Sequence, residues 1–399
     1  MGKVVFCYVV FVSILLWMRF ANAGSSGGYN INVVSYGARS DGQSDASQAF
    51  LKAWGWACHS ADLPVTIYVP RGTFLLKALQ FSGPCKTRIT FWIDGNIVAP
   101  SNYWQLGNSG YWILFRNLNR ISVRGAGTID GRGRGFWACR RKSNNCPAGA
   151  RSISFSWCNN VVMSGVTSLN SQSIHVALNH CNNVVIKEVK IRAPSSSPNT
   201  DGIHIQYSKG VTITAATIMT GDDCISIGTG SSNLWMERIS CGPGHGISIG
   251  SLGDYAKEEG VYNVTVTSST FTKTQNGVRI KSWARPSNGY ASDIMFRNLI
   301  MKNVQNPIII DQKYCPGKQG CPHQSSGVKI SRVTYKNIWG TSATPIALNL
   351  YCSSSNPCWG IKLEDIKLTY YNKPATSLCA NAHGTASGVL IPTSCLSNN

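Results

Sequence analysis

Short apolar alternations recur along most of the chain, and many of them are introduced by turn residues. One series of these runs begins at Ile121, Val161, Val184, Val211, Leu234, Val264, Ile294, Val328 and Ile361. A second series, offset along the same repeats, begins at Ser173, Gly202, Cys224, Gly246, Gly277 and Pro307. Two or more short strands in each repeat of roughly 20 to 45 residues are typical of a solenoid, whose neighbouring repeats bury each other's apolar faces.

Two other architectures with many short elements fit the pattern less well. A leucine-rich repeat requires a regular frame of Leu and Asn that this chain lacks. An antiparallel sandwich does not keep two phrases in fixed relation over so many repeats. The pattern therefore predicts an all-β fold, a right-handed single-stranded parallel β-helix (a solenoid), as one catalytic domain over residues 24–399. Stacked Ile and Val side chains would face inward, and outer positions would carry function.

Both open ends of such a coil need covers, because an unpaired sheet edge invites pairing with other chains. Apolar residues at helical spacing from Ala49 to Ala57 predict an amphipathic capping helix over residues 44–58, with Ser44 or Asp45 as its N-cap. This helix would lie in an N-terminal cap of about residues 24–60. A C-terminal tail of about residues 378–399, held by Cys379 and Cys395, would close the other end.

The segment from Met1 to Ala23 is predicted to be a secretory signal peptide. Lys3 precedes an apolar run from Val4 to Met18, and small residues end the segment at Ala23. A membrane anchor is the competing interpretation, but the apolar run is shorter than the ~20 residues that span a bilayer. We expect a secreted, extracellular protein with no membrane attachment.

Cysteine usage agrees with an oxidising compartment. Removal of the signal leaves 14 of the 15 cysteines, and four pairs lie close in sequence: Cys139 with Cys146, Cys315 with Cys321, Cys352 with Cys358, and Cys379 with Cys395. Cys224 and Cys241 are a further candidate pair, whereas Cys158 and Cys181 occupy matching places in two coils and are candidate buried thiols. Zinc is disfavoured because no CxxC or HxxxH spacing accompanies the cysteines. Spacing alone leaves the connectivity open.

The balance of charge indicates a polyanionic partner. The chain has 37 basic and 17 acidic residues, and the mature protein carries a net charge of about +18. Such a field raises the local concentration of a polyanion. Charge alone would favour nucleic acid, but the signal peptide and the cysteines favour an extracellular acidic polysaccharide instead.

Three aspartates stand out in this basic chain, in the strings NTDG (Asn199 to Gly202) and GDDC (Gly221 to Cys224). The phrases that start at Asp201, Asp223 and His245 follow one another at equal steps along the sequence. On neighbouring rungs of a parallel sheet, ~4.8 Å apart, these residues would stack into one cluster beside Asp222. Because a buried carboxylate is costly, we place them at corners that precede the strands.

A second row of the same ladder lies three positions further on. It comprises His204, Ser226, Ser248 and Arg279. Since isoleucines flank His204, this row should face outward, with Arg279 on the surface and Lys281 two residues on.

The acidic cluster has three possible interpretations. Carboxylate oxygens could bind calcium, although calcium sites rarely set His, Arg and Lys around the ion. Turn aspartates could form a purely structural network. The third interpretation is a set of carboxyl groups with separated pKa values, as glycosidic hydrolysis requires, with Arg279 and Lys281 binding the carboxylates of an acidic sugar chain.

The four strings NTDG, GDDC, GHGISIG (Gly244 to Gly250) and RIK (Arg279 to Lys281) resemble the signature motifs of polygalacturonases, in glycoside hydrolase family 28. The resemblance extends over essentially the mature chain and is strongest to plant enzymes. It implies that Asp222 protonates the glycosidic oxygen while Asp201 and Asp223 activate water. His245 would orient or tune the acid, unless it is a structural turn histidine.

The resemblance also implies the substrate contacts. Arg279 and Lys281 would bind galacturonate carboxylates, unless either is only a solvated charge. Tyr314 matches a sugar-contacting tyrosine, although it could merely pack beside Cys315, and Asn199 matches a motif position that shapes a turn.

The implied activity is inverting hydrolysis of the α-1,4-galacturonosyl linkages of homogalacturonan, in the plant cell wall, without metal or cofactor. We expect an endo-acting monomer that binds neither nucleic acid nor membrane, with a glycosylation sequon at Asn263. Inversion is in tension with carboxylates one rung apart, because that spacing is nearer the ~5 to 5.5 Å of retaining enzymes. The alternatives are an exo-acting enzyme, a rhamnogalacturonan hydrolase, a pectate or pectin lyase, and a non-catalytic wall-binding protein.

Overall fold

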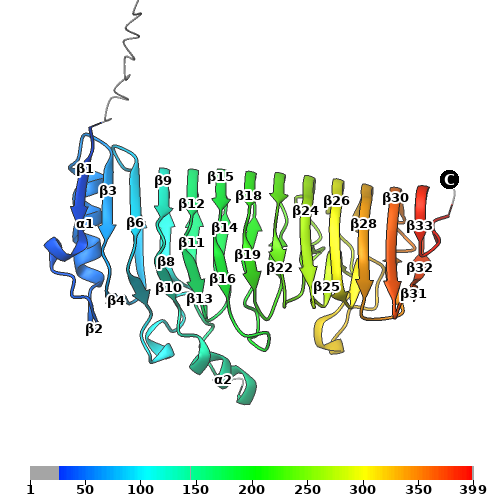
Figure 1. Cartoon of the computed structure of the whole chain (residues 1–399), viewed down its shortest axis with the longest axis horizontal. Helices are drawn as coiled ribbons and strands as arrows, with labels where there is room; N and C mark the ends of the chain where they lie inside the picture. The colour runs from blue at the N-terminus through cyan, green and yellow to red at the C-terminus, as the bar shows by residue number, and fades with distance from the viewer. Residues whose placement is uncertain (1–26, 144, 398–399) are drawn as a thin grey trace, which may run out of the picture.

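The computed structural model describes residues 27–143 and 145–397, so the predicted signal peptide lies outside the described residues. The chain winds into a right-handed parallel β-helix, and the colour in Figure 1 runs steadily from one end of the coil to the other. This confirms the predicted fold. Within the described residues, no helix is long and apolar enough to cross a membrane.

The described strands form two sheets. One sheet has 11 strands: β5 (Leu79–Ser82), β8 (Tyr111–Arg116), β11 (Arg151–Ser156), β14 (Val176–Asn179), β17 (Ile203–Gln206), β20 (Ile225–Ile227), β23 (Ile247–Leu252), β25 (Asn276–Trp283), β27 (Asn306–Tyr314), β29 (Ile346–Tyr351) and β32 (Thr376–Ala380). We call it the cleft sheet, because the candidate site lies on it.

The second sheet has 22 strands and wraps the rest of each coil. Its strands are β1 (Tyr29–Asn32), β2 (Asp41–Asp45), β3 (Val65–Val69), β4 (Thr73–Leu75), β6 (Ile89–Ile93), β7 (Asn96–Val98), β9 (Asn119–Arg124), β10 (Thr128–Asp130), β12 (Asn159–Ser164), β13 (Thr167–Leu169), β15 (Asn182–Lys187), β16 (Lys190–Arg192), β18 (Lys209–Thr214), β19 (Thr217–Met219), β21 (Ser232–Glu237), β22 (Ser240–Cys241), β24 (Val261–Thr272), β26 (Tyr290–Val304), β28 (Lys329–Ser342), β30 (Cys358–Tyr370), β31 (Lys373–Pro374) and β33 (Ala382–Ile391). The pairings are parallel except for that of β30 with β31.

The coil interior is a stack of aliphatic side chains. In the cleft sheet, Ile203 pairs with Ile225, Ile225 with Ile247, and Ile247 with Val278. These four side chains are at most 1% exposed. Burying such residues on every rung removes a large apolar area from water and fixes the register, since a slip of one residue would turn them outward.

The N-terminal end is covered as predicted, but the helix starts later. Helix α1 spans Ser47–His59, and Ser44 belongs to strand β2 instead of the helix. Ala46 is the N-cap residue, while Oδ1 of Asp45 accepts a hydrogen bond from the backbone N–H of Ser47 at 3.0 Å. Asp45 thus satisfies an early helical N–H from a position inside a strand.

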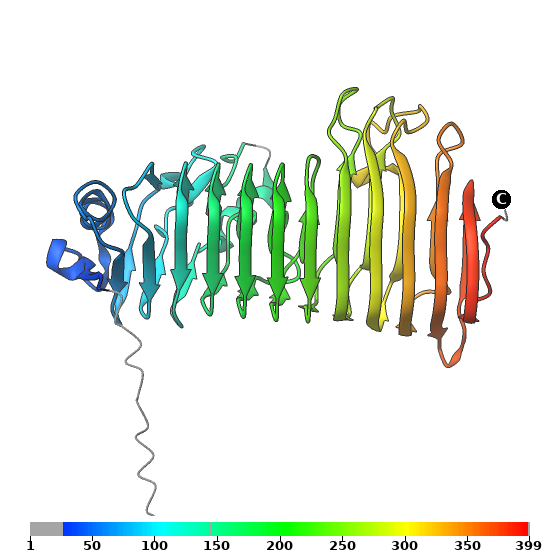
Figure 2. The same cartoon turned by 90° about the horizontal axis from the view of Figure 1, so that it is seen from above.

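The other helical segments are short. They are α2 (Arg134–Lys142) and the 3₁₀ turns η1 (Val33–Tyr36), η2 (Tyr103–Gln105) and η3 (Pro316–Lys318). Helix α2 extends below the coils in Figure 1, and Figure 2 shows long loops rising from the C-terminal half of the coil. The predicted C-terminal tail differs from the structure, because residues 376–391 still add strands to both sheets.

Six disulfides brace the described chain. They join Cys58 to Cys85, Cys139 to Cys146, Cys224 to Cys241, Cys315 to Cys321, Cys352 to Cys358, and Cys379 to Cys395. The first pair, 27 residues apart, ties the end of α1 to the coil and was missed by sequence spacing. Cys158 and Cys181 are buried free thiols.

Candidate active site

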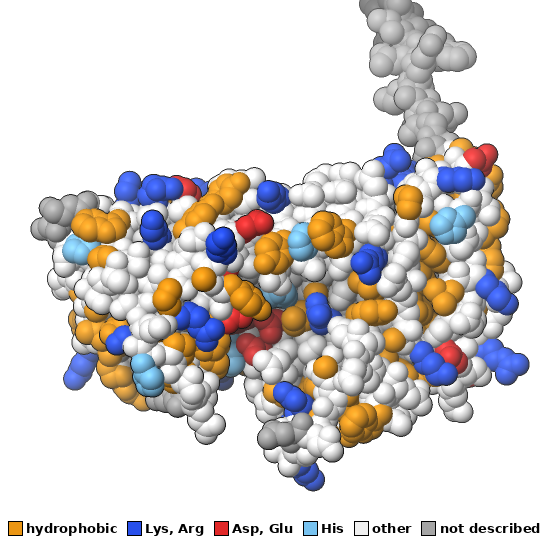
Figure 3. Space-filling model, turned by 180° about the vertical axis from the view of Figure 1, so that it is seen from behind, with side chains coloured by type: hydrophobic (Ala, Val, Ile, Leu, Met, Phe, Trp, Pro, Cys, Tyr) orange, Lys and Arg blue, Asp and Glu red, His pale blue; other side chains and the backbone are white. Residues whose placement is uncertain are grey.

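An open pocket of about 300 Å³ lies on the outer face of the cleft sheet, over β17, β20 and β25. All three aspartates line it, together with Asn199, His204, Lys281 and Tyr314. Figure 3 shows acidic side chains gathered in a hollow near the middle of this face, with basic side chains around them. The structure thus brings most of the predicted site residues together.

The register of the cleft sheet agrees with the predicted ladder. His204 pairs with Ser226, Ser226 with Ser248, and Ser248 with Arg279. Asp201, Asp223 and His245 come two residues before the paired isoleucines of their coils, at corners that precede the strands. Gly246 makes the corner after His245 possible, because its φ is 89° and a Cβ there would lie 2.1 Å from the Asn276 carbonyl oxygen.

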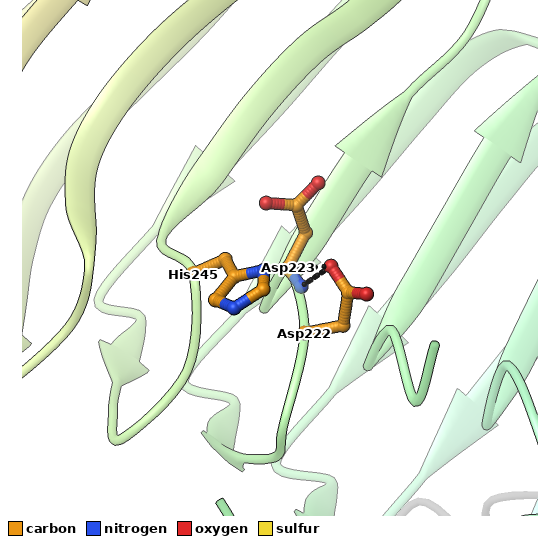
Figure 4. A group of neighbouring side chains, drawn as sticks. All are labelled: Asp222, Asp223 and His245. Atoms are coloured by element: carbon orange, nitrogen blue, oxygen red, sulfur yellow. Dashed lines mark hydrogen bonds and ion pairs between the residues drawn. The ribbon is translucent and has the colours of Figure 1, made fainter. Parts of the chain in front are cut away.

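Asp222, which lines the pocket, forms a hydrogen-bonded pair with His245, which does not. Nδ1 of His245 lies 3.0 Å from Oδ1 of Asp222, and the same oxygen accepts the backbone N–H of Asp223 at 2.8 Å. Burial raises the pKa of Asp222, but the hydrogen bond and the charge of His245 outweigh it and leave the pKa below its ordinary value. Figure 4 shows how the side chains of Asp222 and Asp223 leave the chain in different directions.

Asp223 is buried and surrounded by donors. Its Oδ1 accepts from Ser248 Oγ at 2.8 Å and from Arg279 Nη2 at 3.0 Å, and its Oδ2 accepts from Lys281 Nζ at 2.9 Å. The Asp223 side chain is only 1% exposed. These charge-assisted bonds compensate a carboxylate that would otherwise be costly to bury.

The same contacts correct the predicted position of the two cations. Arg279 and Lys281 are 9% and 7% exposed and therefore buried, whereas the sequence predicted that Arg279 lies on the surface. The outward row does face away from the apolar interior, but the guanidinium turns along the sheet toward Asp223, two rungs away. Of the two cations, Lys281 lines the pocket.

Asp201 lies on the adjacent rung with one neutral donor. Its Oδ2 accepts a hydrogen bond from Ser226 Oγ at 2.6 Å. Burial is the main cause that raises the pKa of Asp201 to about 7, and the negative charges of Asp222 and Asp223 add to it. Asp201 and Asp222 are thus unequal, and Asp201 holds a proton more readily than Asp222.

Tyr314 and Asn199 border the pocket. The Tyr314 ring centroid lies 5.0 Å from Lys281 Nζ and 5.7 Å from Arg279 Cζ, so the tyrosine contacts the cations as well as Trp283. Asn199 adopts a positive φ of 53°, a conformation that asparagine tolerates better than most residues, and it shapes the turn before Asp201.

The structure adds a pocket wall that the sequence did not reveal. The loop after β23 contributes Asp254, Tyr255 and Glu258 to the pocket lining. The Glu258 carboxylate accepts the backbone N–H groups of Gly253, Asp254 and Tyr255 at 2.7, 2.6 and 2.9 Å. The sequence did carry a signal for this wall, because three acidic residues fall within six positions (254–259) of a chain that has only 17 acidic residues.

The aspartate cluster includes a candidate metal site. Ligand atoms of Asp222, Asp223 and His245 lie within 4.8 Å of one another, a spacing that could hold a metal ion. However, Arg279 and Lys281 already occupy the oxygens of Asp223, and their positive charges oppose a second cation there.

The predicted glycosylation residue lies away from the pocket. Asn263 is within strand β24 at a φ of 53°, and not in a loop between coils, and its Nδ2 donates to Asn233 Oδ1 at 2.7 Å. Its side chain is exposed, so it stays a candidate for modification.

Comparison with known proteins gives consistent matches. The model of the glycosyl hydrolases family 28 matches residues 58–390. The chain is 53% identical over 384 residues to a polygalacturonase of Prunus persica, covering 96% of this chain and 97% of that one. It is 43% identical to an exopolygalacturonase of Platanus acerifolia, covering 92% and 98% of the two chains. An endo-xylogalacturonan hydrolase of Aspergillus tubingensis shares the fold, with a TM-score of 0.74 and 22% identity over 91% of this chain and 99% of that one.

Proposed function

Because the chain belongs to the glycosyl hydrolases family 28, we propose that it is a polygalacturonase that hydrolyses the α-1,4-galacturonosyl linkages of pectin homogalacturonan. The observation that carries the proposal is the cluster of three aspartates and Lys281 that lines one open pocket, with His245 hydrogen-bonded to Asp222. Carboxyl groups with separated pKa values supply the acid and the base, and the basic surface attracts the polyanion.

In the proposed mechanism Asp222 protonates the glycosidic oxygen, and Asp201 takes a proton from the attacking water. The pKa directions in the protein without substrate oppose this assignment, because they favour a proton on Asp201 and a charge on Asp222. The Asp222–His245 contact offers a resolution. A proton on Nδ1 of His245 reaches Asp222 along a 3.0 Å hydrogen bond, so the pair stores the proton that the leaving group needs.

Asp223 supports the other two aspartates in this mechanism. Both of its oxygens are held by Arg279, Lys281 and Ser248, so it fixes the two cations beside the pocket. Lys281 then meets a galacturonate carboxylate, with Tyr314 against the sugar. We assign Arg279 mainly to holding Asp223, since its contacts are to Asp223 and Ser248.

We further propose inverting, endo-acting hydrolysis by a monomeric, extracellular enzyme of the cell wall, with residues 24–399 as one domain. Support for endo action comes from the openness of the pocket and from the cleft sheet, which continues beyond the catalytic rungs on both sides. Proton NMR of the first-formed product tests inversion. A β-configured reducing end is expected, and an α-configured one would contradict the proposal.

The activity itself is tested with purified protein on polygalacturonic acid in the presence of a chelator. New reducing ends without ultraviolet-absorbing unsaturated products are expected, because hydrolysis leaves no double bond whereas a lyase does. The variant Asp222→Asn should lose this activity. An equal yield of reducing ends from Asp222→Asn would refute the catalytic role, and unsaturated products would indicate a lyase.

A further inference from the structure

Three hydrogen-bonded side chains run from Asp201 into the pocket. The hydroxyl of Ser226 donates to Asp201 Oδ2 at 2.6 Å, and Nδ1 of His204 lies 2.8 Å from the same hydroxyl. The parallel pairing of β17 with β20 sets His204 directly beside Ser226, so the register of the sheet builds the contact. His204 also lines the pocket, and because its Nδ1 is turned to Ser226, Nε2 is left for the pocket.

The single proton of the serine hydroxyl makes the state of Asp201 and the tautomer of His204 interdependent. When Asp201 is ionised, Ser226 donates to it and must accept the Nδ1–H of His204, which leaves Nε2 as an acceptor. When Asp201 is protonated, it donates to Ser226, and Ser226 donates to a bare Nδ1. In that second state Nε2 carries the hydrogen.

Both states have a neutral imidazole, and the surroundings favour this. Burial lowers the pKa of His204 to about 4, although Gln206 on the same strand raises it. The charged groups near the ring are Arg151, Asp223 and Lys281, which come from β11, the corner before β20, and β25. Those near Asp201 are Asp222, Asp223 and Lys281.

We propose that Ser226 and His204 form a proton relay that carries the proton of resting, protonated Asp201 to the pocket and then holds the ionised Asp201 in place as the base. The proposal rests on the proposed function, because it assumes that Asp201 is the base. In the hydrolytic step a water O–H bond breaks and its proton moves to the ionised Asp201, while the water oxygen bonds to the anomeric carbon. The glycosidic C–O bond breaks at the same carbon, and its oxygen takes a proton from Asp222.

The relay runs from the second state, in which Asp201 is protonated, Nδ1 is bare and Nε2 carries the hydrogen. The proton on Asp201 passes to Ser226 Oγ, the former hydroxyl proton of Ser226 passes to His204 Nδ1, and the proton on Nε2 passes to a water in the pocket. Asp201 is then ionised, Ser226 donates to it, and Nδ1 carries a hydrogen. The proton that Asp201 takes up during hydrolysis finds Nδ1 already protonated, so it leaves Asp201 directly to the pocket that Asp201 lines. His204 therefore acts through Ser226 as a positioning and relay residue.

The relay is tested first without substrate, by nitrogen NMR of the full chain labelled with ¹⁵N-histidine. The His204 signals should change from an Nδ1–H to an Nε2–H tautomer as the pH falls, with the midpoint of Asp201 ionisation. Ser226→Ala and Asp201→Asn should each abolish that transition. A tautomer that stays constant across the titration of Asp201 would overturn the proposal. Because no substrate is present, this result is independent of the proposed function.

Kinetics on polygalacturonic acid give the second readout. His204→Phe and Ser226→Ala should each lower kcat about tenfold with KM changed less than about twofold, and the double variant should be no worse than either. Because the Ser226 hydrogen bond lowers the pKa of Asp201, its loss should move the acid limb of kcat/KM to higher pH.

The conservative variants separate a relay from a structural role. Ser226→Thr keeps the hydroxyl and should retain most of kcat, as should His204→Asn, whose amide replaces Nδ1. The matched control is Ser154→Ala. It removes a buried hydroxyl on the same row, two rungs before His204, and should leave both kcat and the acid limb of kcat/KM unchanged. If both relay variants keep the wild-type acid limb, the proposal is wrong. If His204→Phe does not fold, Ser226→Ala decides the question alone.

Discussion

His245 Nδ1 and Asp222 Oδ1 lie 3.0 Å apart, although the two residues are 23 positions apart in sequence. The contact follows from the coil, since the backbone N–H of His245 also donates to the carbonyl of Asp222 at 2.8 Å. One turn of the β-helix therefore fixes the imidazole against the carboxyl group twice, through the backbone and through the side chain.

Removal of the imidazole should raise the pKa of Asp222. In His245→Phe the hydrogen bond and the charge of His245 that lower this pKa are gone while burial remains, and only the Asp223 backbone N–H and the Lys281 charge still oppose the rise. We expect kcat/KM to fall about 10² to 10⁴-fold, the usual range for a lost acid–base partner, and its pH profile to move to higher pH.

The matched control for that change is His245→Asn, whose amide can still donate near the position of Nδ1. It should keep Asp222 oriented but hold no titrating proton, so its kcat should lie between those of the wild type and the phenylalanine variant. Equal activity of all three proteins would exclude the stored proton.

The identity of the general acid should be visible with an activated substrate. An oligogalacturonide with a nitrophenolate leaving group needs no protonation of the departing oxygen. Asp222→Asn should therefore recover most of its activity on that substrate, whereas Asp201→Asn, which lacks the base, should not. The comparison is the ratio of kcat/KM on the activated and natural substrates for each variant. Recovery by Asp201→Asn alone would assign the acid to Asp201, as the pKa directions in the free protein favour.

Asp201 should reduce the stability of the protein near neutral pH. Its folded pKa of about 7 lies above the value of 3.8 for a free aspartate, so the folded state binds more protons between these values. Stability is then lost as the pH rises from about 4 to 7, by on the order of a few kcal/mol. Asp201→Asn should thus raise the Tm at pH 7.5 and leave it unchanged near pH 4. Thermal melts at both pH values check this, and a lower Tm at pH 7.5 would contradict it.

The regular parts of the molecule were predictable from the sequence because a repeat carries its own register. Equal steps along the sequence place Asp201, Asp223 and His245 on successive rungs, and the observed pairing of the isoleucines that follow them agrees. Long-range features that follow no period were missed, such as the Cys58–Cys85 disulfide and the turn by which Glu258 holds its own loop. The charge of Arg279 was noted, but its burial depends on where the side chain turns, which no spacing encodes.

Loss of one of the two cations that pair with the buried Asp223 should strongly destabilise the folded protein. Lys281→Met leaves Asp223 Oδ2 without its partner at 1% exposure, and removal of one member of a buried pair typically costs about 3–5 kcal/mol. We expect a loss near the lower end, because Arg279 remains on Oδ1. When Asp223 has already been replaced by Asn, Lys281→Met should lower the free energy of unfolding less, since no carboxylate is left uncompensated. Chemical denaturation of the four proteins of this double-mutant cycle measures the coupling, and additive losses would show that the pair contributes nothing.

Product sizes during early digestion should distinguish internal from terminal attack. An endo-acting cleft must admit the polymer on both sides of the catalytic rungs, and the cleft sheet continues on both sides, from His204 to Ala177 and from Arg279 to Ile309. We therefore expect a spread of oligomers and a rapid fall in viscosity while few reducing ends have formed. The wall loop gives a matched variant, because Glu258→Gln weakens the acceptor that holds Gly253, Asp254 and Tyr255. It should broaden the early product sizes through a looser wall without removing a carboxyl group of the catalytic cluster. Monomer as the sole early product of the wild type would show that the cleft is closed at one end and that the enzyme is exo-acting.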